Sequence, residues 1–594
     1  MKSYSERTDA VIRKMETIKQ QRKRRRALIT GIGTCCVVAV LLAVLFVPFS
    51  HKLPDVSAYR GSPYYQVIKS LNKASHRPSE YKNNFELLMH NLGDMFAGAM
   101  KEDMMNGAAG GAAVQENLSS PLSNSYQEVT DNQVAGVIEA DLFKRTDKHI
   151  FYLQDLTLKA YTIAQEDSAM VGGYALQPWE QTSGWLNGCE MYLSRDGKTI
   201  TVMMSGYGDL EGKKSSFTCV VSLDVSDPAN MKEVGRIYIT GSYLSSRMVD
   251  GKLLVMSEMY VWNPDFDKEE TFLPQIGTPG NMQSIPAENI ICPETVNNVR
   301  YTVVTALTEK DLSQAGHTAF LGYTDALYVS GNNIFTTREY IKDCTMTEIS
   351  WVSYGEALEY RGSISVAGWV KDQYSMDEYE GILRVVTSTD DGGAGRNASL
   401  YCIDIESKKV VASVEKFAPE GERAESVRFD GTMAYVCTAE VVTLTDPVYF
   451  FDLSDLENIT VKDTGTIDGY SSSLVNFGDG FLLGIGFGDT RQLKIEIYAE
   501  NDTGVVSVDT LELEAEFSLD YKSYLIDREN KLIGLGIWSW DSGDTQYLLV
   551  GFDGVRLKTL KEEPLEGNVH QMRATIIDGW LYLLAKEFKA VPLM

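Results

Sequence analysis

Residues 223–256 read LDVSDPANMKEVGRIYITGSYLSSRMVDGKLLVM, and residues 451–485 read FDLSDLENITVKDTGTIDGYSSSLVNFGDGFLLGI. The two stretches match in the positions of their apolar runs and turns and nearly in length. Residues 401–437, YCIDIESKKVVASVEKFAPEGERAESVRFDGTMAYVC, keep the same order. In each copy, strand-forming runs alternate with Asp, Gly, Asn and Pro turns, which is typical of consecutive antiparallel hairpins. The sequence therefore predicts a repeat protein built from hairpins.

An Asp-Gly or Asn-rich turn that leads into an apolar run recurs at a nearly fixed interval. Successive turns are 49, 54, 82, 48, 50, 49, 50 and 49 residues apart. A period of about 40 to 50 residues with four short strands is typical of β-propellers, whose blades bury their faces only by closing into a ring. The nine turns lie at residues 147, 196, 250, 332, 380, 430, 479, 529 and 578.

The fold class is therefore all-β, a single β-propeller of four-stranded blades over residues 130–594. Since rings of four to eight blades are usual, we expect eight blades, within a range of seven to nine. The last turn is followed by only enough chain for one further strand, so residues 129–137 are expected to donate a strand that joins the two ends of the ring. The long step of 82 holds residues 260–295, which we expect to project from one blade as a binding insertion.

The N-terminal region is read as a membrane anchor. Residues 1–26 carry ten Lys/Arg against three acidic residues, a net charge of +7, and residues 27–49 hold no charge. As a helix, 27–49 would be about 34 Å long, enough to cross a bilayer. The apolar run exceeds that of a cleaved signal peptide, so a signal anchor is favoured. The basic arm then lies in the cytoplasm, as a topogenic charge cluster or resting on an anionic membrane surface, and the propeller is extracytoplasmic at the cell membrane.

Residues 50–129 are expected to form a helical stalk and a Gly/Ala/Ser linker. Ser62 and Pro63 suit the start of a short helix through Leu71. A second helix over residues 80–105 has an apolar seam that could pair two chains in weak self-association or pack onto the propeller or the neighbouring helix. The linker spans residues 107–125.

Charge and cysteine content exclude several classes of protein. The chain carries −27, so subtracting the arm's +7 leaves residues 27–594 at −34, which argues against nucleic acid as a partner. Such a surface tolerates cationic partners or divalent ions, or simply keeps a large exported domain soluble. Six cysteines follow the anchor without C-x-x-C spacing, which leaves one disulfide open and gives no support to a zinc site.

The sequence shows no recognisable catalytic motif. The six histidines are scattered, and no nucleophile elbow, zinc-protease motif or phosphate loop is present. We therefore assign no catalytic residue, no metal and no cofactor, and an enzyme is the less favoured interpretation.

Several motifs resemble one known family. Residues 131–141, DNQVAGVIEAD, are similar to the opening signature of the bacterial and archaeal secreted proteins with a C-terminal β-propeller distantly related to WD40 repeats. Residues 241–248, 373–379 and 423–429 are similar as well, so the resemblance spans roughly 130–594. Ile138 and Lys148 depart from the family's acidic residue and turn glycine. The resemblance implies the propeller fold and little about activity.

Candidate ligand-binding residues come from two places. Innermost strands precede the turns, so their charges could point into the channel, as a ligand-binding ring or as pairs that brace the blades. The exposed insertion supplies aromatic candidates. The favoured function is a membrane-anchored, non-catalytic binding or scaffold module for a protein, peptide or cell-wall polymer; the alternative is a hydrolase or lyase of an exported polymer at the channel mouth. The candidates are Glu139, Asp141, Arg247, Asp377 and Arg428 in the channel and Tyr260, Trp262 and Phe266 in the insertion.

Overall fold

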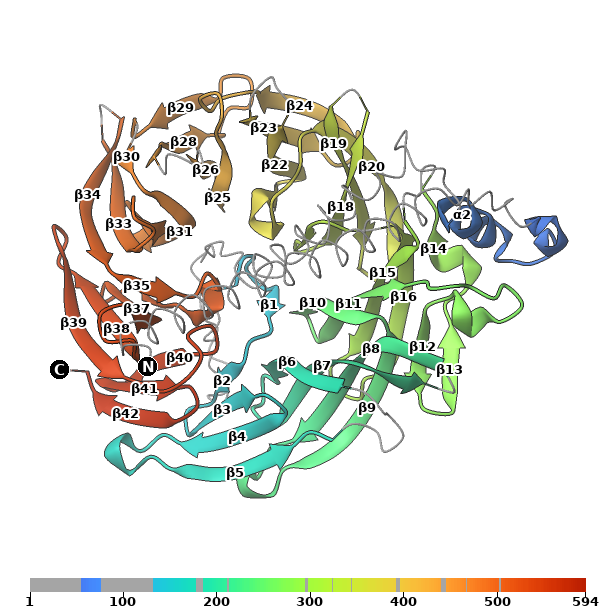
Figure 1. Cartoon of the computed structure of the whole chain (residues 1–594), viewed down its shortest axis with the longest axis horizontal. Coiled ribbons are helices and arrows are strands. Elements are labelled where there is room, and N and C mark those ends of the chain that lie inside the picture. Colours follow the sequence, from blue (N-terminus) through green and yellow to red (C-terminus); the bar gives the residue numbers. More distant parts are fainter. Residues whose placement is uncertain are drawn as a thin grey trace, which may run out of the picture. The chain divides into compact units, whose positions relative to one another are not determined.

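The computed structural model describes residues 55–75, 132–177, 185–210, 213–293, 298–322, 324–342, 344–390, 396–439, 445–465, 467–501 and 504–593. The chain divides into two compact units, residues 1–58 with 75–102 and residues 59–74 with 103–594. The second unit holds all the strands described below. They form nine blades arranged in a ring, as Figure 1 shows with the chain running from cyan to red. This confirms an all-β propeller, with one blade more than the eight expected.

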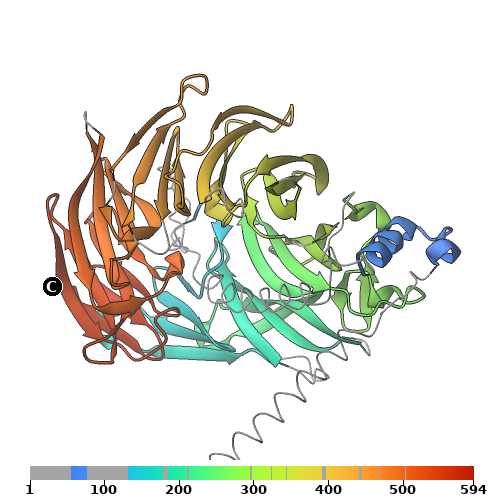
Figure 2. The same ribbon diagram turned by 45° about the horizontal axis from the view of Figure 1, so that its top comes forward.

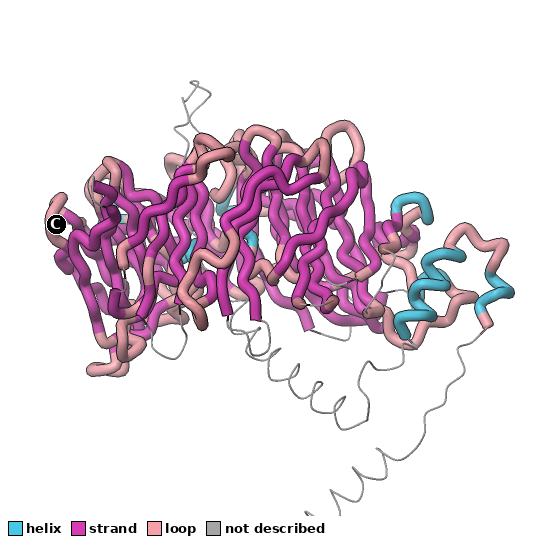
Figure 3. The backbone as a smooth tube through the Cα atoms, turned by 90° about the horizontal axis from the view of Figure 1, so that it is seen from above, coloured by secondary structure: helices cyan, strands magenta, loops and turns pink. Residues whose placement is uncertain are grey.

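Each blade is an antiparallel sheet whose strands follow one another from the centre of the ring outward, and in Figure 3 the strands cross the thickness of the ring. Blade one consists of β2 (Phe143–Arg145), β3 (His149–Gln154), β4 (Thr157–Thr162) and β5 (Met170–Ala175), and blade two of β6 (Trp185–Leu193), β7 (Thr199–Leu210), β8 (Lys213–Asp224) and β9 (Lys232–Thr240). Blade three consists of β10 (Ser242–Val249), β11 (Lys252–Tyr260), β15 (Arg300–Thr308) and β16 (Gln314–Leu321). Blade four consists of β17 (Leu327–Val329), β18 (Asn333–Ile341), β19 (Thr345–Ser353) and β20 (Glu359–Ala367).

Blades five to eight continue the same order. Blade five consists of β21 (Met376–Tyr379), β22 (Ile382–Asp390), β23 (Arg396–Asp404) and β24 (Lys409–Val414), and blade six of β25 (Arg423–Asp430), β26 (Met433–Ala439), β28 (Val448–Asp452) and β29 (Thr460–Asp463). Blade seven consists of β31 (Tyr470–Gly478), β32 (Phe481–Phe487), β33 (Leu493–Asn501) and β34 (Gly504–Leu513). In blade eight, β35 (Ala515–Phe517) and β36 (Leu525–Asp527) both pair with β37 (Leu532–Ser539), which is followed by β38 (Thr545–Phe552) and β39 (Leu557–Pro564). A two-stranded ribbon, β27 (Thr445–Asp446) and β30 (Ile467–Asp468), accompanies blade six.

The ninth blade has three strands in the described chain, β40 (Arg573–Ile577), β41 (Trp580–Leu584) and β42 (Phe588–Pro592). The expected donation by residues 129–137 is wrong for the described part of that segment. Val134 bridges Val137, and the next strand, β1 (Ile138–Glu139), pairs with β10 of the third blade. In Figure 1, β1 lies inside the ring. The segment is used at the centre instead of at the end of the ring.

Side-chain packing joins the ninth blade to the first. Tyr161 stacks on Phe588 with ring centroids 4.3 Å apart, and the hydroxyl of Tyr152 donates to the carbonyl of Gln571 at 2.8 Å. An apolar cluster from both blades surrounds these contacts. Similar clusters lie between neighbouring blades elsewhere in the ring, for example between blades four and five. The hydrophobic core is thus distributed between the blades, and side-chain packing joins the last blade to the first without a strand exchanged among the described residues.

The inserted residues of the long step extend two sheets, so the expectation of a projecting loop is only partly right. β12 (Gln275–Thr278) pairs with β9 of blade two and with β13 (Asn281–Ser284), while β14 (Ile290–Ile291) pairs in parallel with β16 of blade three. The helix α2 (Tyr65–Ser75) begins three residues after Ser62, where a helix is expected, and residues 65–74 of it belong to the second unit. Its preceding residue, Tyr64, donates to the carbonyl of Ile285 at 3.1 Å.

Short 3₁₀ helices connect several of these strands. They are η2 (Gln165–Asp167), η3 (Pro228–Asn230), η4 (Glu269–Thr271), η5 (Ala287–Asn289), η6 (Gln373–Ser375) and η7 (Tyr521–Ser523); a further one, η1 (Val56–Tyr59), precedes α2.

Glycine is required where the outer strand of one blade crosses to the inner strand of the next. Gly241 lies between β9 and β10 with φ +99°, and a Cβ there would stand 2.6 Å from the carbonyl oxygen of Glu258. Gly469 repeats the arrangement before β31, with φ +73° and the carbonyl oxygen of Phe487 2.3 Å away. Only glycine fits such a positive φ and such a close approach. The shared Gly in the two matching repeats therefore has a steric cause.

The predicted basic arm (1–26), anchor (27–49), 80–105 helix and 107–125 linker lie outside the described residues. No helix in the described ranges has the length and hydrophobicity needed to span a bilayer. The six cysteines after residue 50 are all described and all free, so the structure forms no disulfide among them.

Charged side chains also connect blades away from the centre. Lys371, which precedes blade five, donates to the carboxylate of Glu425 in blade six at 3.2 Å, and Arg423 donates to the same carboxylate at 2.5 Å. Burial raises the pKa of Glu425, but Lys371 and Arg423 together outweigh burial and hold it below its usual 4.5. Glu425 thus favours ionisation in the folded state more than in the unfolded state.

We expect Glu425→Gln to weaken the pH dependence of stability on the acid side. A carboxyl whose folded pKa is depressed contributes stability above its unfolded pKa, and this contribution is lost as the pH falls through the folded value. The thermal midpoint should therefore drop less steeply below about pH 4.5 in the variant than in the parent chain. Differential scanning fluorimetry from pH 3 to pH 7 measures this, and parallel curves for the two proteins would contradict it.

Candidate functional site

The innermost charges meet at the centre of the ring, where residues 132–141, here called the leading segment, cross to several blades. Gln133 donates to the carbonyls of Gln373 and Met376 in blade five, both at 3.1 Å. Asp141 forms a bridge with Met191 of blade two. Figure 2 shows the leading segment inside the ring, beside the inner strands. One short stretch of chain therefore touches blades that are far apart in the sequence.

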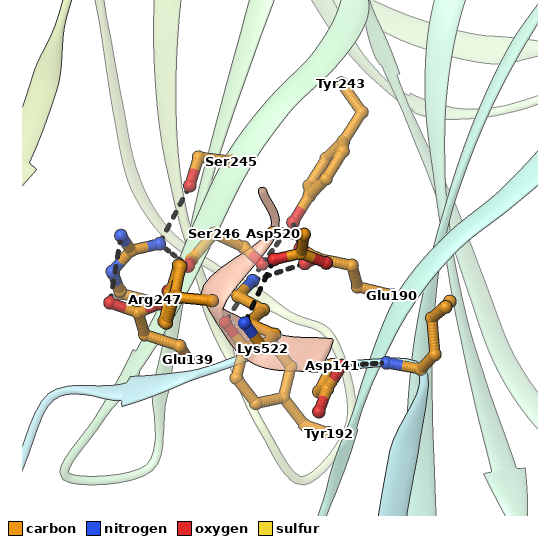
Figure 4. A network of polar contacts seen from close by, with 12 residues as sticks. Glu139, Asp141, Glu190, Tyr192, Tyr243, Ser245, Ser246, Arg247, Asp520 and Lys522 are labelled. Carbon is orange, nitrogen blue, oxygen red and sulfur yellow. Dashed lines mark hydrogen bonds and ion pairs between the residues drawn. The ribbon is translucent and has the colours of Figure 1, made fainter. Parts of the chain in front are cut away.

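Glu139 is the most connected of the predicted residues. Its side chain is 1% exposed and lies 3.4 Å from the guanidinium of Arg247, its partner across β1 and β10. The amide of Gln373 donates to Glu139 at 3.4 Å, and Arg247 donates to Gln373 at 2.8 Å. The hydroxyl of Tyr521, from blade eight, also donates to the carboxylate of Glu139. Figure 4 shows the Glu139–Arg247 contact. This carboxylate ties blades three, five and eight together.

Asp141 makes the second central ion pair. Arg573 of the ninth blade donates to it at 2.8 Å and to Asp520 of blade eight at 3.0 Å. Both Asp141 and Arg573 are almost fully buried. Burial raises the pKa of the Asp141 carboxyl above its usual value, and the positive charge of Arg573 opposes the shift. The pair lies where the last blade meets the start of the first.

A third pair stands next to these two. Lys522 donates to the carboxylate of Glu190, which also accepts from the hydroxyl of Tyr243 at 2.8 Å, as Figure 4 shows. Burial lowers the pKa of Lys522, but Glu190 and Glu139 outweigh burial and raise it above its usual value. Lys522 is therefore held as an ammonium ion between carboxylates.

Two 3₁₀ turns carry the residues that sequence reasoning missed. In η6 the side chain of Asp372 accepts from the backbone N–H of Tyr374, and in η7 the side chain of Asp520 accepts from the backbone N–H of Lys522. Tyr374 and Tyr521 meet edge to face with centroids 5.1 Å apart. The shared Asp-x-x-Ser pattern in these two turns, 372–375 and 520–523, was the available signal.

The central network is balanced in charge. Each of its four carboxylates has a cationic partner, and a further cation, Lys144, donates to the carbonyl of Glu139 at 3.0 Å. Among the described residues, no group of three or more His, Cys, Asp or Glu side chains could hold a metal ion. The ion pairs connect the leading segment to blades three and nine, and connect blade eight to blades two and nine. The geometry is that of a brace across the ring.

Two other channel candidates lie apart from this network. Asp377, on β21, accepts from Nε of Arg384 at 3.0 Å, and Arg384 reaches the carbonyl of Gly431 in blade six at 2.6 Å. Arg428, on β25, is buried opposite Tyr435 of β26. Four of the five charges predicted for the channel lie on strands and Asp141 lies in an isolated bridge, but only Glu139, Asp141 and Arg247 come together.

The insertion candidates divide into exposed and packed side chains. Trp262 is 76% exposed and Tyr260 is 47% exposed, with ring centroids 6.0 Å apart. The guanidinium of Arg300 lies 5.5 Å from the Tyr260 centroid and 3.3 Å from the carboxylate of Glu258. Phe266 instead packs edge to face on Tyr59, 5.9 Å away, and on Phe272. The aromatic surface of the insertion is therefore the Tyr260–Trp262 pair.

Comparison with known proteins finds relatives in archaea. An uncharacterized protein of Archaeoglobus fulgidus is 29% identical over 255 residues, which are 42% of this chain and 38% of the relative. The uncharacterized protein MJ1554 of Methanocaldococcus jannaschii is 30% identical over 225 residues, 36% of this chain and 34% of the relative. The match thus spans little more than a third of either relative's length.

Comparison with solved structures gives matches at low similarity. The periplasmic gluconolactonase PpgL of Pseudomonas aeruginosa matches with a TM-score of 0.32 and 10% identity over 77% of this chain and 99% of its own. The dihydro-heme d1 dehydrogenase NirN matches with a TM-score of 0.35 and 12% identity, covering 72% of each chain. The model of the beta propeller domain family matches residues 128–585, which is most of the chain and includes the first eight blades and strands β40 and β41 of the ninth. The chain therefore belongs to the beta propeller domain family.

Proposed function

We propose that this chain is a membrane-anchored, extracytoplasmic propeller that binds a protein, peptide or cell-wall polymer and catalyses no reaction. Residues 27–49 would hold it in the membrane, with residues 1–26 in the cytoplasm. The 80–105 helix is a candidate for weak self-association.

The exposed Tyr260–Trp262 pair is the observation that carries this proposal. A tryptophan with three quarters of its surface in water has no role in the core, and tryptophan and tyrosine are enriched where proteins meet partners. Tyr260 is the last residue of β11 and Trp262 lies two residues beyond it. Arg300, paired with Glu258, contacts the ring of Tyr260. The pair is a binding surface on a rigid element.

The central network offers less for catalysis. A hydrolase or lyase of an exported polymer needs carboxylates that are free to exchange protons with substrate. Within the described part of the chain, the four central carboxylates face cationic partners instead. We therefore favour the binding module over the enzyme.

Binding is tested by co-sedimentation of the detergent-solubilised full chain with insoluble cell-wall preparations and with immobilised envelope proteins. We expect the Trp262→Ala chain to lose at least tenfold in bound fraction, because its aromatic face supplies much of the contact area. Trp540→Ala, at a tryptophan 38% exposed in blade eight, is the control and should bind like the parent. Equal sedimentation of all three proteins, or none above background, would overturn the proposal.

A further inference from the structure

The surface around the aromatic pair is acidic. Residues 260–293 contain five carboxylates, Asp265, Asp267, Glu269, Glu270 and Glu288, all exposed, against one basic residue, Lys268. Lys268 lies 3.4 Å from Asp265. Since consecutive residues span at most about 3.6 Å each, Asp265 and Asp267 lie within about 18 Å of Trp262 along the chain. Exposed aromatic faces and excess negative charge therefore occupy one part of the surface.

The molecule already places a cation on this aromatic pair. Arg300 stands over the ring of Tyr260 while its charge is matched by Glu258. The negative face of an aromatic ring attracts ammonium and guanidinium groups, and tryptophan does so most strongly. Trp262 is the more exposed ring of the two. Arg300 thus shows how a cation can bind between an aromatic ring and a carboxylate in this region. Trp262 and the neighbouring carboxylates could bind a cation of a partner molecule in the same way.

We propose that Tyr260, Trp262 and the acidic residues 265–270 form a docking surface for an extended peptide segment rich in lysine and arginine on a partner protein. This inference rests on the binding function proposed above and names the class of partner. The charge of −27 over the whole chain repels polyanions and steers cationic segments toward the protein. A peptide that alternates basic and small residues presents its cations singly to the ring and to the carboxylates.

The test uses fluorescence anisotropy with the full chain in detergent and three labelled decapeptides, (Lys-Gly)5, (Gln-Gly)5 and (Glu-Gly)5. We expect (Lys-Gly)5 to bind at least tenfold more tightly than either other peptide, with an affinity that falls as salt is raised from 50 to 300 mM. Trp262→Ala and the isosteric double variant Asp267→Asn/Glu269→Gln should each weaken (Lys-Gly)5 binding by about tenfold.

Blade eight supplies the matched control, because Trp540 is an exposed tryptophan followed directly by the exposed Asp541. Trp540→Ala/Asp541→Asn should leave (Lys-Gly)5 binding unchanged. Equal loss in this control and in the insertion variants, or no preference for (Lys-Gly)5, would overturn the inference. If (Lys-Gly)5 fails while Trp262-dependent sedimentation with wall or envelope material persists, the binding function stands and the cationic-peptide assignment falls. If both fail, both proposals fall.

Discussion

Arg573→Met should destabilise the chain by about 3 to 5 kcal/mol, because it removes the cation from a buried ion pair and leaves a carboxylate without its charge partner. Arg573 donates to Asp141 at 2.8 Å and to Asp520 at 3.0 Å, and both Asp141 and Arg573 are almost fully buried. The pair sits at the joint between the ninth and first blades, where no strand is exchanged among the described residues. Urea unfolding followed by circular dichroism measures the loss.

Two further variants separate the ion pair from general damage to the ninth blade. Lys586→Met breaks an exposed pair with Glu566 at the edge of the same blade and should cost less than about 1 kcal/mol. The double variant Asp141→Asn/Arg573→Met should be more stable than Arg573→Met alone, since it leaves no bare carboxylate at position 141. The single variant Asp141→Asn completes the comparison. If the loss of unfolding free energy in the double variant equals the sum of the losses in Asp141→Asn and Arg573→Met, the two charges are not coupled and the ion pair does not stabilise the joint.

The propeller fold could be predicted from the sequence because each blade contains its own characteristic turn residues. Asp250-Gly251 and Asp479-Gly480 adopt positive φ in the hairpins between first and second strands, which a short-range pattern can specify. The expected number of eight blades is one too low, because it follows the usual range of ring sizes, whereas each of the nine turns marks one blade. The partner of the leading segment could not be found from the sequence alone, since Glu139 pairs with Arg247 more than a hundred residues away.

The candidate site was predicted in part for the same reason. Placing Arg247 on the inner strand of its blade needed only the position of that strand within its repeat, and the acidic residues of the leading segment come just before the first blade. Their partners Arg573 and Tyr521 come from blades that ring closure alone brings near, with sequence separations of 432 and 382 residues. The exposed aromatic pair was easier to find, because it stands at the end of the β11 apolar run where the polar, acidic insertion begins.

Glu139→Ala is expected to cost about as much as Arg573→Met, because it leaves the guanidinium of Arg247 buried without its carboxylate. The substitution should also weaken contacts to other blades, since the Glu139 carboxylate accepts hydrogen bonds from Gln373 of blade five and Tyr521 of blade eight. Loosening these contacts should free the leading segment before the blades themselves unfold. Limited proteolysis of the native protein should therefore cut residues 132–141 faster in Glu139→Ala than in the parent.

Glu139→Gln distinguishes the charge from the hydrogen bonds. Glutamine keeps one accepting oxygen, which can still accept from Tyr521, but it carries no charge. This variant should therefore fall between the parent and Glu139→Ala in urea stability. Its leading segment should be cut at a rate closer to that of the parent, because the accepting atom remains in place. If the Gln and Ala variants are equally unstable and are cut at equal rates, the charge of Glu139 alone stabilises the centre of the ring. If both variants resist unfolding and cleavage as well as the parent, the leading segment does not stabilise the ring.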